Sequence, residues 1–157
     1  PTAMLMFELD AAKLFDTAVE SQGKVFVATE LGGGGSTNPE RMAIAERGIR
    51  NFLIHFGLID GELALPDEPQ VFVDMPDASC YVQSEHTGLL ELTLALNDQV
   101  REGEVIARIY DMTRTGAAPV EYRAKRSGVL VARRFPSLVN MGDTIAVIAE
   151  VVDSLDA

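Results

Sequence analysis

A β-prone run that ends in one carboxylate and four consecutive glycines constrains the first third of the chain. Residues 24–35 read KVFVATELGGGG, which predicts a strand over residues 25–29 with Glu30 at its carboxyl end. Ligands of α/β sheets bind beyond the carboxyl ends of the strands, so Glu30 is a candidate site residue. The glycines permit positive φ and let the backbone approach a ligand closely. The alternative is a solvated strand-end residue before a flexible loop.

Nucleotide-binding motifs fit this glycine run poorly. Ser36 and Thr37 follow the glycines without the lysine that a P-loop requires. The dinucleotide-binding pattern fits only loosely, and a lone glycine cluster is weak support for it. The run therefore does not by itself predict a nucleotide site.

Further α/β elements flank the predicted strand. We expect a short buried strand over residues 1–8 and a helix over residues 11–22. A second helix is expected to begin with Asn38 as its cap and Pro39 in its first turn, and to end at Gly57. Its apolar stripe consists of Met42, Ile44, Ala45, Ile49, Phe52, Leu53 and Phe56. These elements form half of an α/β unit, so an apolar sheet edge or face stays exposed unless a partner covers it.

An acidic connection separates this unit from a β-rich second half. Residues 60–77 contain six acidic residues, three prolines and no basic residue, which favours a solvated connection. Beyond it, a G-[LV]-L, V-x-x-G, I-A order begins at Gly88 and recurs at Gly128, forty positions later. This recurrence predicts two related hairpin units packed into a small all-β sandwich or flattened barrel. The expected domains are residues 1–60 (α/β), 61–70 (linker), 71–152 (β) and 153–157 (tail).

The composition limits the classes of binding partner and the cellular compartment that we expect for this chain. The formal net charge of −11 and a pI near 4.5 argue against nucleic acid, because phosphate binding needs clustered cations. A single cysteine, Cys80, gives no disulfide framework and is typical of a reducing compartment, so the cytoplasm is expected. We find no 18-residue apolar run and no signal peptide, and we expect no membrane association.

Several separated motifs resemble one enzyme family. They are residues 29–35 (TELGGGG), 51–57 (NFLIHFG), 74–77 (DMPD), 111–116 (DMTRTG), 119–124 (PVEYRA) and 140–143 (NMGD). The chain resembles the succinylglutamate desuccinylase/aspartoacylase family, relatives of the zinc carboxypeptidases, in the branch that contains N-acetyl-diaminobutyrate deacetylase of ectoine breakdown. The resemblance implies that Glu30 is the general base and acid of a zinc-dependent hydrolase that removes an acetyl or succinyl group from an amino-acid nitrogen. It further implies that Gly32 and Gly33 lie close to the substrate.

The metal ligands of that family have no counterpart in this chain. The family binds zinc with an H-x-x-E pair and a second histidine that precede the catalytic glutamate, whereas His55 and His86 both follow Glu30 and neither begins H-x-x-E. We therefore expect the C-terminal portion of a longer enzyme, with residues 1–60 in its catalytic domain and the upstream part of that domain as a partner. Zinc is expected in the full-length enzyme, whereas this portion alone should be inactive and hold no tight zinc. An exposed sheet edge also favours a homo-oligomer.

The doubled pattern of the β half is similar to that of biotinyl and lipoyl carrier domains. A carrier would need an acceptor lysine at the tip of its central hairpin, but residues 110–119 contain none. Lys125 falls in a predicted strand. A non-catalytic β binding or assembly module is the alternative function.

Basic residues concentrate between positions 108 and 134. They are Arg108, Arg114, Arg123, Lys125, Arg126, Arg133 and Arg134, against two acidic residues. We expect some of them, Arg114 first, to face a substrate carboxylate or an acidic surface of a neighbouring subunit, because arginine binds carboxylates in bidentate geometry. Scattered solvated strand residues are the equally strong alternative.

Overall fold

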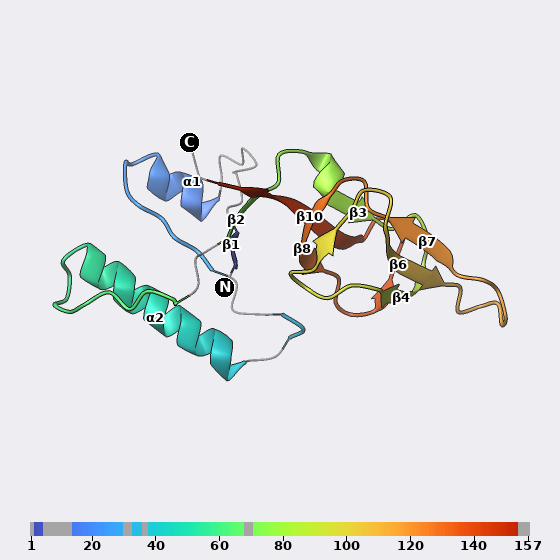
Figure 1. Cartoon of the computed structure of the whole chain (residues 1–157), viewed down its shortest axis with the longest axis horizontal. Coiled ribbons are helices and arrows are strands. Elements are labelled where there is room, and N and C mark those ends of the chain that lie inside the picture. The colour runs from blue at the N-terminus through green and yellow to red at the C-terminus, as the bar shows by residue number, and fades with distance from the viewer. Residues whose placement is uncertain (1, 5–13, 30–32, 36–37, 68–70, 154–157) are drawn as a thin grey trace. The chain divides into compact units, whose positions relative to one another are not determined.

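The described part of the fold consists mostly of strands and includes two α-helices. The computed structural model describes residues 2–4, 14–29, 33–35, 38–67 and 71–153 of the 157-residue chain (Figure 1). The chain divides into two compact units. One, called here the β unit, consists of Pro1–Phe7 and Glu68–Ala157; the other, called here the helical unit, is Glu8–Asp67. Among the described residues, neither helix is long and apolar enough to cross a membrane.

The helical unit contains α1 (Phe15–Glu20) and α2 (Pro39–His55). The side chain of Asn38 caps α2, because its Oδ1 accepts hydrogen bonds from the backbone N–H groups of Glu40 at 2.9 Å and Arg41 at 3.4 Å. Gly57, at φ +66°, follows the last turn in the left-handed conformation that often ends helices. The predicted start and end of this helix are confirmed. The predicted first helix is shorter than expected, although residues 11–13 lie outside the described residues.

The apolar stripe of α2 is only partly covered. The helix has no buried residue, and the large side chains of Met42, Ile44 and Ile49 are 41–62% exposed. The segment after the helix contains no helix or strand in residues 58–67, but the Asn51 amide exchanges two hydrogen bonds of 2.9 Å with the backbone of Ala64. These bonds hold the segment against the helix; Phe52 and Leu53 of the stripe are half-buried, whereas Met42, Ile44 and Ile49 stay exposed.

The strand predicted over residues 25–29 does not form. These residues are extended, and Val25 and Val27 are 59% and 69% exposed. A strand needs a hydrogen-bonded neighbour, and no described strand pairs with this segment. The β-prone composition therefore indicates only that these residues favour extended backbone. No described strand pairs with them to form a sheet.

The β unit contains two sheets. The first has the order β1 (Thr2–Met4), β2 (Val71–Asp74), β10 (Thr144–Val152), β8 (Gly128–Arg133) and β5 (Gln99–Val100), and β3 (Tyr81–Gln83) also pairs with β10. The second has the order β7 (Val120–Arg123), β6 (Val105–Tyr110), β4 (Gly88–Leu92) and β9 (Leu138–Val139). All pairs are antiparallel except β1 with β2. The sheets do not close into a barrel, so that alternative is wrong.

One hydrophobic core cluster draws on both sheets. Its largest fully buried side chains are Ile106 and Ile109 of the second sheet and Leu130, Ile145 and Ile148 of the first. Full burial of such a side chain contributes about 1.5–3 kcal/mol to folding. The β unit is therefore stabilised by a core of its own. Strand β1 pairs with β2, so the described part of the first eight residues is a strand of this unit.

The same turn occurs twice in the β unit. Between β5 and β6, the Glu104 carboxylate accepts a hydrogen bond from the backbone N–H of Arg101 at 2.9 Å. Between β9 and β10, the Asp143 carboxylate accepts one from the N–H of Asn140, also at 2.9 Å. The glycine of each turn has a positive φ, a conformation that favours glycine. The turns predicted from the V-x-x-G pattern are confirmed.

The first residues of β4 and β8 also match. A Cβ atom on Gly88 would lie 2.3 Å from the carbonyl oxygen of Tyr110, and one on Gly128 would lie 2.2 Å from that of Ala149. Neither position has room for a side chain. At both sites glycine lets a strand lie closely beside the backbone of the strand with which it pairs.

Candidate functional site

Two of the predicted site residues, Glu30 and Gly32, lie outside the described residues. Gly33 is exposed, and a Cβ atom there would meet no atom within 4 Å. Gly34 and Gly35 have φ values of +73° and +68°, so two of the four glycines adopt the positive φ predicted for the run. A Cβ atom on Gly35 would likewise meet no atom within 4 Å, so neither Gly33 nor Gly35 is in contact with another described part of the chain.

The other predicted site residue, Arg114, lies in the loop of residues 111–119. This loop joins β6 to β7 and extends beyond both strands (Figure 1). The Arg114 side chain is exposed, and among the described residues it makes no ion pair. Asp111 Oδ1 accepts hydrogen bonds from the N–H of Thr113 at 2.8 Å and from Thr113 Oγ1 at 2.7 Å. The loop is thus closed on itself and presents a guanidinium to solvent.

Several of the other basic residues are paired inside the chain. An exposed network crosses β4, β6 and β7, in which Arg108 lies 3.5 Å from Glu91 and 3.7 Å from Glu121, and Arg123 lies 2.6 Å from Glu121. Tyr110 donates a hydrogen bond of 2.8 Å to Glu91, and this bond raises the pKa of Tyr110. Arg108 and Arg123 therefore have carboxylate partners within the β unit, and the expectation that some of the basic stretch, Arg114 first, faces a substrate or a neighbouring subunit stays a prediction.

Arg126 is the most enclosed of the basic residues with an ion pair, with a side chain 13% exposed. It forms an ion pair with Glu150 of β10 and donates a hydrogen bond of 3.0 Å to the sulfur of Cys80, in the 3-10 helix η1 (Ala78–Cys80). It also lies 3.9 Å from Asp77, whose pKa is lowered by hydrogen bonds from Ser79 and, to a smaller extent, by the Arg126 charge. Cys80 is fully buried, as expected, but its cationic neighbour was missed because the two residues are 46 positions apart.

The histidines have structural partners. His86 Nδ1 lies 2.7 Å from the hydroxyl oxygen of Tyr122, which also accepts a hydrogen bond of 2.9 Å from the N–H of Glu85. His55 is in the last turn of α2 and packs edge-on against Phe56, with ring centroids 4.9 Å apart. Neither histidine faces a nucleophile among these contacts.

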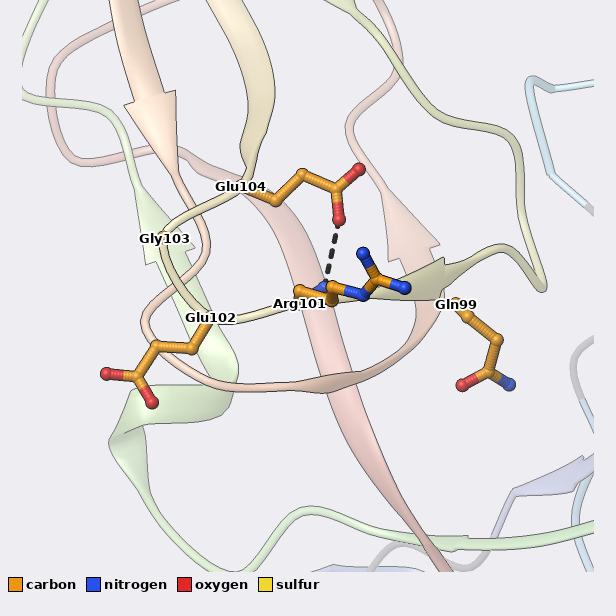
Figure 2. Close-up of a pocket in the computed structure, with 5 residues that line it drawn as sticks. All are labelled: Gln99, Arg101, Glu102, Gly103 and Glu104. Carbon is orange, nitrogen blue, oxygen red and sulfur yellow. Dashed lines mark hydrogen bonds between the residues drawn. The ribbon is translucent and has the colours of Figure 1, made fainter.

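One pocket in the described part lies on the turn between β5 and β6. Its volume is about 510 Å³, and Figure 2 shows the five residues that line it: Gln99, Arg101, Glu102, Gly103 and Glu104. The Glu104 carboxylate is directed at the backbone of Arg101, whereas the Glu102 side chain points away from it (Figure 2). The polar groups do not converge on one point, so the pocket offers no catalytic arrangement.

Comparison with known proteins identifies several that are similar to this chain. No family model matches it. It is 76% identical over 155 residues to N-alpha-acetyl-L-2,4-diaminobutyric acid deacetylase from Halomonas elongata, a match that covers 99% of this chain and 45% of that protein. A succinylglutamate desuccinylase from a Silicibacter species has a similar structure, with 50% identity and a TM-score of 0.89 over 97% of this chain and 46% of its own. The chain is thus similar to part of proteins of the succinylglutamate desuccinylase/aspartoacylase family.

A further family structure carries a bound product. It is the ectoine utilization protein EutE (DoeB) from Ruegeria pomeroyi, with 46% identity and a TM-score of 0.90 over 96% of this chain and 46% of its own. The resemblance drawn from the sequence motifs is confirmed by these matches. The chain spans about half the length of the relatives it matches.

The zinc that the family resemblance implies does not fit the described residues. A catalytic zinc site needs three protein ligands. In residues 2–4, 14–29, 33–35, 38–67 and 71–153 no three His, Cys, Asp or Glu side chains are grouped to hold a metal ion. His86 bonds to Tyr122, and Cys80 is buried beside Arg126. These side chains therefore offer no basis for a metal-dependent step.

Proposed function

We propose that this chain is part of a deacylase that removes an acetyl or succinyl group from the nitrogen of an amino acid. The observation that carries the proposal is the 76% identity over 155 residues to a protein named as an N-alpha-acetyl-diaminobutyric acid deacetylase. The ectoine utilization protein at 46% identity supports a role in ectoine breakdown. Cys80, the single cysteine of the chain, supports a cytoplasmic location.

Glu30 is the proposed general base and general acid. Its carboxylate takes a proton from the attacking water, the water oxygen bonds to the acyl carbon, and the carbon–nitrogen bond breaks. The same carboxyl group then gives the proton to the departing amine. Gly32 and Gly33 would let the backbone lie beside the substrate, and the open space at Gly33 supports this. Arg114 is the proposed carboxylate-binding residue.

The assay that tests this function uses a protein of the relatives' full length that carries these 157 residues. N-acetyl-2,4-diaminobutyrate and N-succinylglutamate are supplied separately, and release of the free amine is followed. We expect hydrolysis of at least one of them by the longer protein and none by the 157-residue chain alone. Failure of the longer protein to cleave any N-acyl amino acid would reject the function.

We also propose that zinc ligands lie outside these 157 residues. In the whole protein zinc would polarise the acyl group and activate water. For the 157-residue chain we expect less than about a tenth of an equivalent of zinc after dialysis, because isolated histidines do not assemble a three-ligand site. Metal analysis by mass spectrometry measures this. Stoichiometric zinc would show that the ligand set lies within the chain.

The exposed stripe of α2 is the proposed contact with the upstream part of the same catalytic domain. Met42, Ile44 and Ile49 are large apolar side chains on a helix that buries none of its residues. Met42 and Ile49, seven residues apart, lie on one side of the helix, and an exposed apolar face of this kind marks an interaction surface. If the upstream part does not cover it, self-association into a homo-oligomer would.

We further infer that residues 71–152 of the β unit form a sandwich of two related hairpin units. The matched glycines Gly88 and Gly128, the two carboxylate-capped turns and the core cluster shared by both sheets support this. In the longer protein its proposed role, implied by the family resemblance, is to flank the active site or to build an oligomer. The β6–β7 loop contains no lysine, which argues against a carrier function.

A further inference from the structure

Another pocket lies inside the β unit, where β8 ends beside β10. Its volume is about 260 Å³, which is smaller than the usual site of a drug-sized ligand. Its lining consists of residues 132–135 and of Thr144, Ala146 and Val147. Arg133 pairs with Ala146 across the two strands, and Arg134 donates a backbone hydrogen bond of 3.0 Å to the carbonyl oxygen of Ile145. The pocket is therefore built on paired backbone of a single unit.

The polar side chains that line this pocket are hydrogen-bond donors. Arg133 is exposed and makes no ion pair within the part of the chain that the structure describes. Arg134 lies 3.1 Å from the carboxylate of Asp143, but its Nε is buried and has no hydrogen-bond partner. The hydroxyl group of the half-buried Thr144 also has no partner among the described residues. None of the lining residues is acidic, so donors and positive charge are in excess here.

An excess of donors of this kind fits an oxyanion. A buried N–H group without an acceptor is unfavourable, and the oxygens of a bound anion would supply acceptors. Guanidinium groups bind phosphate with two parallel hydrogen bonds. A phosphate group presents three acceptor oxygens and about two negative charges at pH 7, whereas a carboxylate presents two oxygens and one charge. Two neighbouring arginines and a hydroxyl group therefore suit phosphate better than carboxylate.

Phe135 adds an apolar surface to the same pocket. Its side chain follows the two arginines and is 65% exposed. Aromatic rings contribute large contact areas when a ligand covers them. A ligand that carries an organic group next to its phosphate would cover this ring, whereas free phosphate would leave it in water.

We propose that this pocket binds the phosphate group of a small phosphate monoester. Arg133 is the principal binding residue, Arg134 and Thr144 donate further hydrogen bonds, and Phe135 packs against the organic group of the ligand. The site lies wholly within the β unit and concerns binding without a chemical step. The inference is therefore independent of the deacylase function, and either can fail without the other.

The test is a titration of the isotope-labelled 157-residue chain with phenyl phosphate, followed by NMR. The β unit has a core of its own in this chain. We expect saturable shifts of the backbone amide signals of residues 132–135 and 144–147, with a Kd of about 1 mM at low ionic strength. The signals of residues 101–104, at the other pocket, should stay in place. Absence of saturable shifts at residues 132–135 and 144–147 would overturn the inference.

Two further ligands separate the possible sources of the anion. Phenylacetate carries a ring and a carboxylate, and we expect it to bind at least about tenfold more weakly than phenyl phosphate. Inorganic phosphate should bind about threefold more weakly, and Phe135→Ala should remove this difference by weakening phenyl phosphate alone. Equal affinity for phenylacetate would overturn the assignment to phosphate. Equal affinity of the wild type for inorganic phosphate would overturn the assignment to a monoester.

Substitutions at Arg133 test the binding residue directly. Arg133→Ala should raise the Kd for phenyl phosphate about tenfold, because it removes a charged hydrogen-bond donor. Arg133→Lys should raise it only about threefold, because lysine keeps the charge but not the planar fork. The urea midpoint should not change in either variant, since the side chain is exposed.

Arg101 provides the matched control. It is also exposed, and among the described residues its side chain makes no ion pair, but it lies at the pocket between β5 and β6. We expect Arg101→Ala to leave the Kd within about twofold of the wild type, since surface charges at a distance act weakly through solvent. A loss equal to that of Arg133→Ala would overturn the inference in favour of a general charge effect.

Discussion

Gly128→Ala is expected to destabilise the β unit by about 3 kcal/mol, the upper range for overpacking a well-packed interior. The added Cβ atom would lie 2.2 Å from the carbonyl oxygen and 3.0 Å from the carbonyl carbon of Ala149, and 3.1 Å from a side-chain carbon of Ile148. Two of these three atoms belong to the backbone of β10, which pairs with β8 along four residues. The neighbour cannot swing away as a flexible side chain would, so the strands must separate. Gly88→Ala should behave in the same way against Tyr110.

Tyrosine fluorescence during urea unfolding measures this effect in the β unit alone. The chain has no tryptophan, and its three tyrosines, Tyr81, Tyr110 and Tyr122, all lie in that unit. Gly103→Ala is the matched control, because its φ is +80° but a Cβ atom there meets nothing within 4 Å. We expect it to cost about 1 kcal/mol from backbone strain only. Equal losses for Gly103→Ala and Gly128→Ala would show that steric overlap is not the cause.

Local signals allowed α2 to be predicted from the sequence. Asn38, Pro39 and Gly57 each act within one turn of the helix end, through a side-chain cap, a fixed φ and a left-handed residue. The V-x-x-G turns were predictable for the same reason. In each turn a carboxylate accepts a hydrogen bond from the backbone N–H of the residue three positions before it. Such features need no information from distant parts of the chain.

Features that depend on a distant partner were missed or wrong. Residues 25–29 have the composition of a strand, but a strand also requires a neighbour, and the described structure provides none. The contact of Arg126 with Cys80, and its ion pair with Glu150, join positions 46 and 24 residues apart in the sequence. No periodicity encodes such pairs. From the sequence, the basic residues at positions 108–134 could be treated only as one group. The structure distinguishes Arg108, which has carboxylate partners, from Arg114, which makes no ion pair among the described residues.

Glu30→Gln in the longer protein is expected to lower kcat by about a hundredfold or more, the range for loss of a positioned general acid and base. Glutamine has nearly the same size and still forms hydrogen bonds, but it cannot accept the proton of the attacking water. KM should change less than kcat, because the substitution removes an interaction made in the transition state rather than one that binds the ground state. Steady-state kinetics with an N-acetyl amino acid measures both constants.

Glu62→Gln is the control for the loss of a negative charge alone. Glu62 is exposed in the segment after α2, so this variant removes one negative charge without touching residues 30–35, and its kcat should stay within about twofold of the wild type. The pH profile separates a proton-transfer role from a structural one: the proposed role assigns the acidic limb of kcat to ionisation of Glu30, so this limb should disappear in Glu30→Gln. Near-normal turnover, or a reduced turnover that keeps its acidic limb, would contradict the assignment, because a group that still titrates in the variant cannot be the one that was replaced.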